Sequence, residues 1–327
     1  MSRPVFIITI DTEGDNLWAR PDIITTENSK FLLRFQQLCE SFAFKTTYLC
    51  DYEMACCRDF ISLGKKIINN GTGEIGMHLH AWNTPPFYEK IDLLKNSLPY
   101  LTEYPESFMQ EKISFLTKKL EEIFQIKPVS HRAGRWAFNN TYARLLADHA
   151  YKTDCSVTPK VSWTSIQGYA KYGTDYSKFP HLPYFISPED IAKEGNSPLL
   201  EVPMTIFTEA EAQFADLTDV VGKKDSNILQ NIFRKRNNKM PRPLWLRPNG
   251  CNLFEMKAII DHIIEKKYNY AMFMIHSSEL MPGGSPNFIN EEIIENLYWD
   301  VEQLFRYTAE KFSGSTLNEF HDSFIQS

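Results

Sequence analysis

The alternation of short apolar segments with longer amphipathic segments constrains the fold of this chain more than any other feature. In segment 106–126, Ile113, Leu116, Leu120 and Ile123 follow one another at spacings of three and four, which places them on one helical face. Eight apolar segments typical of strands lie at 5–10, 45–50, 74–80, 128–133, 153–157, 199–206, 244–246 and 270–275. This alternation is typical of α/β folds with a parallel sheet, and we expect a distorted (β/α) barrel of seven or eight parallel strands.

Two long segments interrupt the alternation. Residues 158–198 are rich in Pro, Tyr, Ser and Lys, and residues 207–243 contain the basic run 234–239. The basic run fits a solvated loop better than a contact with an anionic substrate. No change of composition marks a linker, so we expect a single domain over 1–327, with rim insertions at about 158–198 and 207–243 that shape a site.

Charge and hydropathy exclude several classes of protein. With 35 Lys+Arg against 41 Asp+Glu, the net charge of −6 argues against dedicated binding to nucleic acid or to anionic membranes. No uncharged apolar run approaches the ~18–20 residues of a transmembrane helix. The apolar run 5–10 is too short for a secretory signal, so we expect a cytoplasmic protein. The six cysteines show no CxxC spacing and fit reduced, mostly buried thiols.

Several predicted strands end in residues suited to catalysis. Asp11 and Glu13 follow the first strand, His78 and His80 lie in the third, and His276 ends the last. Because the carboxyl ends of parallel strands meet at one edge of the sheet, these side chains are expected to converge on one site.

The spacing of these residues favours a metal site. His78 and His80 are two residues apart on a strand and therefore share a face. With Glu13 they make an open three-ligand set of the kind that catalytic zinc uses. Asp11 then becomes a candidate general base toward a metal-bound water. The alternatives are a hydrogen-bonded core histidine and a helix N-cap formed by the carboxylates.

Other polar and aromatic residues are candidates for supporting roles. Arg132 is suited to hold the base through charge-assisted hydrogen bonds, although a purely structural salt bridge has the same geometry. His276 is suited to act as the general acid that protonates a leaving group. Candidate substrate-binding residues near the strand ends are Trp82, Trp136, Tyr52, Asp51 and Asp154. The aromatic residues among them also fit simple core packing.

Five short motifs, in this order, resemble those of the NodB-homology polysaccharide deacetylases, which are metal-dependent carbohydrate esterases on a distorted (β/α) barrel. They lie at 8–13, 74–78, 132–134, 153–156 and 273–276, and the resemblance spans about residues 5 to 285. The resemblance implies that Asp11 is the base, Glu13 and His78 bind the metal, and His276 is the acid. Arg132 would position the base. The sequences around the histidines look most like the WalW-like branch, which is associated with lipopolysaccharide and cell-surface polysaccharide assembly.

The chain departs from the family pattern at three places. The family usually places two metal histidines four residues apart, but Trp82 stands four residues after His78, so His80 has to be the second ligand. Glu13 stands where the family usually has Asp. Gly134 and Arg135 stand where Pro-Tyr is common.

The resemblance implies hydrolysis of an acetamide, rather than an acetyl ester, on a sugar with a divalent metal, for which we expect Zn²⁺. A cytoplasmic location favours an oligosaccharide or a nucleotide-linked or lipid-linked saccharide as substrate. Two alternatives stay open: metal-independent hydrolysis of a cyclic amide or imide on the same fold, and a carbohydrate-binding barrel without catalysis.

Overall fold

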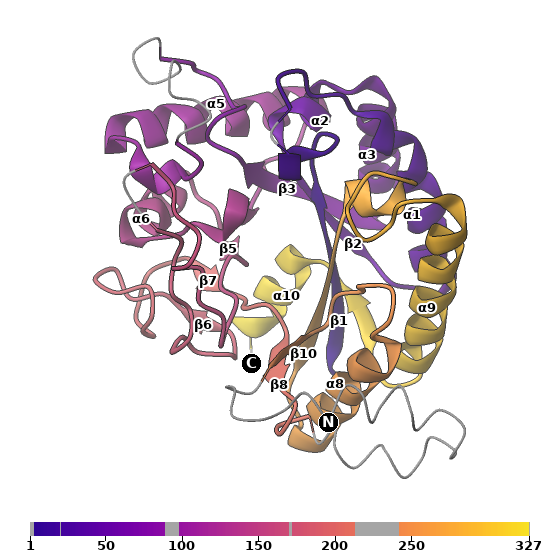
Figure 1. The fold of residues 1–327 in the computed structure, drawn as a ribbon. Coiled ribbons are helices and arrows are strands. Elements are labelled where there is room, and N and C mark those ends of the chain that lie inside the picture. The colour runs from indigo at the N-terminus through magenta and orange to yellow at the C-terminus, as the bar shows by residue number, and fades with distance from the viewer. Residues whose placement is uncertain (1–2, 20, 89–97, 170–171, 213–241, 327) are drawn as a thin grey trace.

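The computed structural model describes residues 3–19, 21–88, 98–169, 172–212 and 242–326. Its main sheet is curled and has the strand order β10-β1-β2-β3-β4-β5-β7-β6, with β11 beside β1 (Figure 1). Every neighbouring pair is parallel except β6 and β7. The strands are β1 Val5–Thr12, β2 Thr46–Cys50, β3 Gly73–Leu79, β4 Ser130–Ala133, β5 Thr153–Asp154, β6 Tyr184–Phe185, β7 Leu200–Glu201, β10 Tyr270–His276 and β11 Ser313–Ser315.

Among the described residues, the end strands of the sheet, β6 and β10, do not pair with each other, and the barrel is distorted in this region. The strand predicted at 199–206 divides into β7 and β8 (Ile206–Thr208), and Pro203, which has no N–H to donate, lies in the interruption. The strand predicted at 244–246 is β9 (Pro243–Trp245), but it pairs antiparallel with β8 in a separate sheet, which corrects its predicted direction. Leu246 bridges the gap through backbone hydrogen bonds of 3.1 Å to Thr205 and 3.2 Å to Met274. The predicted distorted (β/α) barrel is confirmed.

Helices cover the outside of the curled sheet (Figure 1). In α5, the residues at helical spacing, Ile113, Leu116 and Leu120, are fully buried, as the sequence predicted. Each such side chain contributes roughly 1.5–3 kcal/mol by leaving water. The helices are α1 Leu32–Ser41, α2 Tyr52–Cys56, α3 Arg58–Asn70, α5 Glu106–Phe124, α6 Asn140–Asp148, α8 Leu253–Lys266, α9 Glu291–Ala309 and α10 Leu317–Phe324. No helix among the described residues is both long and apolar enough to cross a bilayer.

The C-terminal segment closes the amino-terminal end of the strands. Thr316 and Glu319 form a capping box that begins α10. The first turn of α10 docks on the sheet because the backbone N–H of Leu317 donates to Thr47 at 3.2 Å and that of Asn318 donates to the Glu74 carboxylate at 3.2 Å. The opposite, carboxyl-terminal end of the barrel is therefore the end available for a site.

The rim segments are described only in part. Residues 158–198 contain β6, and all of them except 170–171 are described. The basic run 234–239 lies outside the described residues. The assignment of 1–327 to one domain stays a prediction.

Candidate metal and catalytic site

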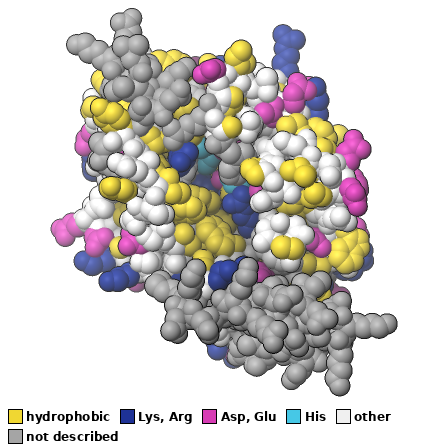
Figure 2. Space-filling view, in the orientation of Figure 1, with side chains coloured by type: hydrophobic (Ala, Val, Ile, Leu, Met, Phe, Trp, Pro, Cys, Tyr) yellow, Lys and Arg dark blue, Asp and Glu magenta, His cyan; other side chains and the backbone are white. Residues whose placement is uncertain are grey.

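A pocket of about 300 Å³ opens at the carboxyl ends of the strands. Figure 2 shows a hollow in this face, with histidine and basic atoms inside it and apolar side chains beside it. Acidic and histidine side chains from three strands or their ends line the pocket, namely Asp11, Glu13, His78, His80 and His276. The predicted convergence of these residues is what the structure shows.

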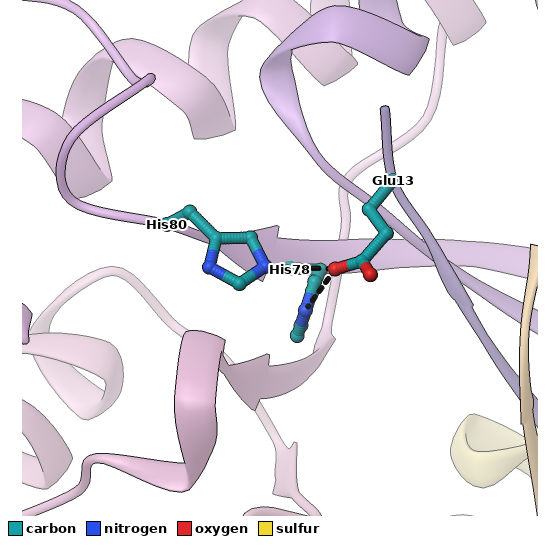
Figure 3. A group of neighbouring side chains, drawn as sticks. All are labelled: Glu13, His78 and His80. Atoms are coloured by element: carbon teal, nitrogen blue, oxygen red, sulfur yellow. Dashed lines mark hydrogen bonds and ion pairs between the residues drawn. The ribbon is translucent and has the colours of Figure 1, made fainter. Parts of the chain in front are cut away.

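Glu13, His78 and His80 point toward one another (Figure 3). Their candidate ligand atoms all lie within 4.8 Å of one another, and all three residues are buried. The Oε2 atom of Glu13 lies 3.4 Å from Nε2 of His78 and 2.8 Å from Nε2 of His80. Ligand atoms about 2.1 Å from a tetrahedral metal lie roughly 3.4 Å apart, which is the separation of Glu13 from His78, whereas Glu13 and His80 lie closer together. One carboxylate and two imidazoles are a donor set that Zn²⁺ accepts, and the residues fit a metal.

The tautomer of His78 suits metal binding. Its Nδ1 lies 2.9 Å from the carbonyl oxygen of Arg132, which only accepts hydrogen bonds, so Nδ1 carries a proton and Nε2 is the atom that faces the site. Burial opposes protonation of His78, but the charge of Asp11 and the hydrogen bond to Glu13 raise its pKa overall, so metal binding would displace a proton from Nε2. Burial and the charge of His78 lower the pKa of His80 to about 4, although the hydrogen bond to Glu13 opposes this shift. His80 is therefore neutral near pH 7, as a metal ligand has to be.

A buried ion pair holds Asp11. Nη1 of Arg132 donates to Oδ1 of Asp11 at 2.5 Å, and the Arg132 side chain is fully buried. Arg132 also donates to Thr9 Oγ1 at 3.0 Å and to the Cys155 carbonyl at 3.1 Å. Burial alone would raise the pKa of Asp11, but the charges of Arg132 and His78 lower it overall. Asp11 is thus an ionised base with a fixed orientation.

Strand register places the candidate acid beside the candidate base. His276 is the direct parallel neighbour of Asp11, and its Nε2 lies 3.7 Å from Oδ2 of Asp11. On the other side of the ring, Nδ1 lies 3.1 Å from Oε2 of Glu279, which also accepts from the His276 backbone at 2.8 Å. Arg247 donates to Glu279 at 2.8 Å and lies 3.0 Å from His276 Nδ1. Burial opposes ionisation of Glu279, but the charges of Arg247 and His276 lower its pKa to about 2.

The turn after β4 passes very close to His80. A Cβ atom on Gly134 would lie 2.6 Å from His80 Nδ1 and 2.6 Å from the Leu79 carbonyl oxygen, so only glycine fits. The next two residues, Arg135 and Trp136, have left-handed backbones with φ of 57° and 59°. Non-glycine residues adopt this conformation at a cost of order 1–3 kcal/mol each. The turn therefore combines close approach with backbone strain beside the candidate metal ligands.

Aromatic side chains form one wall of the pocket. Trp82 and Trp136, both predicted to contact substrate, line it. Trp163 also lines it and is stacked on Trp136, with ring centroids 6.4 Å apart at 7°. Trp245 packs edge-on against Trp163, and a second pocket of about 350 Å³ shares Trp163 and Arg247 with the first.

The structure does not bring Tyr52, Asp51 or Asp154 to the pocket, and we correct their predicted role. Asp51 is fully buried and accepts hydrogen bonds from the backbone N–H groups of Gly14 at 2.9 Å and Met54 at 2.8 Å. It thus caps α2 and fixes the loop that carries Glu13. Tyr52 packs on the helical layer against Phe115.

Asp154 is also an internal structural residue. It is fully buried and lies 2.5 Å from Nδ1 of His131, and it accepts from Ser156 Oγ at 2.9 Å. Ser156 in turn accepts from the Ala133 backbone at 2.8 Å, so Asp154 orders the end of β4.

Sequence reasoning missed Arg247, Glu279, Trp163 and the pocket position of Arg135. Glu279 could have been found, because a residue three positions after His276 returns to its side in one tight turn. At the start of α8, the Asn252 side chain accepts from Asn249 N at 2.9 Å and donates to the Arg247 carbonyl at 2.8 Å. That side chain holds the loop of Arg247 instead of capping α8.

Comparison with known proteins establishes the fold. No family model matches the sequence, and no curated protein sequence matches it significantly. A "putative polysaccharide deacetylase" from Mycobacterium smegmatis is similar, with a TM-score of 0.52 and 12% identity over 99% of this chain and 92% of that chain. The two molecules share one fold. The fold expected from the resemblance to polysaccharide deacetylases is therefore confirmed.

The 4-alpha-glucanotransferase from Thermococcus litoralis is similar as well, with a TM-score of 0.52 and 13% identity. The match covers 99% of this chain but only 41% of the glucanotransferase. Because one barrel supports different chemistries, the activity has to be argued from the residues of the site.

Proposed function

We propose that the protein is a metal-dependent deacetylase that hydrolyses an acetamide on a saccharide. One observation carries the proposal: a Glu-His-His ligand set lies beside an Arg-held aspartate, which itself lies 3.7 Å from a histidine at the end of the neighbouring strand. Three metal ligands with an adjacent base and acid are the components that metal-assisted amide hydrolysis needs.

Glu13, His78 and His80 would hold the metal, for which Zn²⁺ is our assignment. When bound, the metal supplies polarisation of the acetyl carbonyl and a water of lowered pKa. Asp11 accepts the proton of the attacking water, and Arg132 keeps Asp11 ionised and oriented. Glu279, 3.1 Å from Nδ1, orients the His276 ring, and His276 gives its Nε2 proton to the departing amine of the sugar.

The aromatic wall and the second pocket support a saccharide with more than one unit. Trp82, Trp136 and Trp163 offer flat apolar faces suited to sugar rings. The adjoining pocket continues past Trp163. We propose an oligosaccharide or a nucleotide-linked or lipid-linked saccharide as substrate, consistent with a role in lipopolysaccharide assembly. The cytoplasmic location stays a prediction.

The first experiment measures metal content by elemental mass spectrometry on the wild type and on the His78→Ala/His80→Ala double variant. We expect near-stoichiometric divalent metal in the wild type and its loss from the folded double variant. The matched control is His149→Ala, because His149 lies on the outer layer after α6 and away from the pocket.

The second experiment measures acetate release from N-acetylated oligosaccharides. The wild type should release acetate, and His276→Ala should be slower by about 10²-fold or more, the scale for a lost general acid. A protein that binds no metal after reconstitution with Zn²⁺, Co²⁺ and Ni²⁺ would refute the metallo-deacetylase, and hydrolysis of cyclic amides would then be tested. Saccharide binding without any turnover would instead indicate a binding barrel.

A further inference from the structure

The proposed reaction gives no role to Arg135, a cation that lines the pocket. It lines the pocket, and its guanidinium carbon lies 5.7 Å from the centre of the Tyr100 ring. Its Nε atom is buried and has no hydrogen-bond partner among the described residues. A guanidinium that is partly withdrawn from water gains most from a negatively charged partner.

The other charged groups around the pocket are already matched. Asp11 is paired with Arg132 at 2.5 Å. Arg247 is paired with Glu279 at 2.8 Å. Glu13 faces the two candidate metal histidines. Over the described part of the chain, no comparable carboxylate pairs with Arg135, so Arg135 is the surplus positive charge of the pocket.

The backbone around Arg135 is strained. Arg135 has φ 57° and ψ 23°, and Trp136 follows with φ 59°. Two successive non-glycine residues in the left-handed conformation lower the free energy of unfolding, and both line the pocket. Such backbone strain clusters at ligand sites. The close approach of Gly134 to His80 fixes where this turn runs, and therefore where the Arg135 side chain begins.

We propose that Arg135 binds an anionic group of the substrate, so that the site is selective for an acetylated saccharide that carries an oxyanion near its acetamido group. This inference rests on the proposed function. The planar guanidinium matches both a carboxylate and a phosphate through paired hydrogen bonds, and either oxyanion fits the same position. Arg247 lines both pockets, but Glu279 pairs with it at 2.8 Å, so the proposed anion contact is assigned to Arg135.

The test is isothermal titration calorimetry on metal-loaded protein with three probes. N,N′-diacetylchitobiose is neutral, N-acetylmuramic acid carries a carboxylate, and UDP-N-acetylglucosamine carries a diphosphate. We expect at least one anionic probe to bind the wild type on the order of tenfold or more tightly than the neutral probe. The probe that does so identifies the oxyanion as carboxylate or phosphate.

A bound metal also attracts anions, so variants of Arg135 are needed to measure how much of the anion preference comes from Arg135. Arg135→Gln should remove an anion preference of roughly 10- to 100-fold and leave the affinity for diacetylchitobiose unchanged. Arg135→Lys should keep part of the preference. Arg135→Asn is a second neutral variant that tolerates the left-handed backbone. Arg144→Gln is the matched control, because Arg144 is exposed on α6 and pairs with Glu106 at 2.7 Å.

Two results would overturn the proposal: a wild type without preference for any anionic probe, or an undiminished preference in Arg135→Gln and Arg135→Asn. Acetate release that is equally efficient from neutral and anionic saccharides would refute the anion site and leave the deacetylase intact. Arg135-dependent binding of an anion without any acetate release would refute the deacetylase and leave the anion site intact.

Discussion

Replacing Arg132 by Met tests the buried ion pair at the centre of the site. Arg132 is fully buried, and its Nη2 lies 3.1 Å from the Met204 sulfur and 3.4 Å from the Met272 sulfur, so the cavity accepts an apolar side chain. The substitution leaves the Asp11 carboxylate buried without its partner. With charge centres about 4 Å apart and an effective dielectric constant of about 20, the lost attraction is about 4 kcal/mol. This agrees with the 3–5 kcal/mol typical of a broken buried pair.

The assay is urea unfolding at pH 7 in EDTA, so that a bound cation does not neutralise Asp11. We expect Arg132→Met to lower the free energy of unfolding by about 4 kcal/mol. The Asp11→Asn/Arg132→Met double variant should recover about 2 kcal/mol or more, because it buries no lone charge. The deficit of the single variant should shrink at pH 5, because Asp11 without Arg132 has a higher pKa and takes up a proton.

A single-variant loss below about 1 kcal/mol would refute this reasoning. A double variant that loses the sum of the two single losses would refute it as well, since additivity means that the residues do not interact.

Two further predictions follow from contacts around the site. Gly134→Ala should weaken metal binding, measured by competition with a chromogenic chelator, because the added Cβ meets His80 Nδ1 at 2.6 Å. Gly71→Ala is its control, since Gly71 has φ 66° and no atom within 4 Å of an added Cβ, and it should lose stability but keep metal affinity. Glu279→Gln should cost up to roughly 3 kcal/mol in unfolding free energy at pH 7, because the pKa of Glu279 falls from 4.5 to about 2 on folding. That contribution is present above pH 4.5 and is lost as the pH falls toward 2, so urea unfolding should show a smaller difference between wild type and variant at pH 3.5; a difference independent of pH would contradict the shift.

Much of the site could be predicted because its residues follow strands. The period of two places His78 and His80 on one face, and the parallel sheet brings their strand end beside that of Asp11 and Glu13. Such reasoning identifies residues that leave a strand at its carboxyl end. It does not say which of these side chains face the pocket. It therefore wrongly predicts that Asp51, which is fully buried, contacts the substrate.

The rest of the site depends on segments without a local pattern. Trp163 belongs to a rim segment, and Arg247 is held by the side chain of Asn252, which donates to the Arg247 carbonyl oxygen. Nothing in their neighbourhoods in the sequence indicates a pocket.

By itself, the sequence determined the alternation of strands and helices, and hence a barrel with acidic and histidine residues at one end. Periodicity is local, so it is readable without coordinates. Only the tertiary structure decided which polar groups satisfy one another. It paired Arg132 with Asp11 across 121 positions and left Arg135, three residues further on, facing the pocket. Those pairings are fixed by packing between distant segments, and they distinguish a structural carboxylate such as Asp51 from a reactive one such as Asp11.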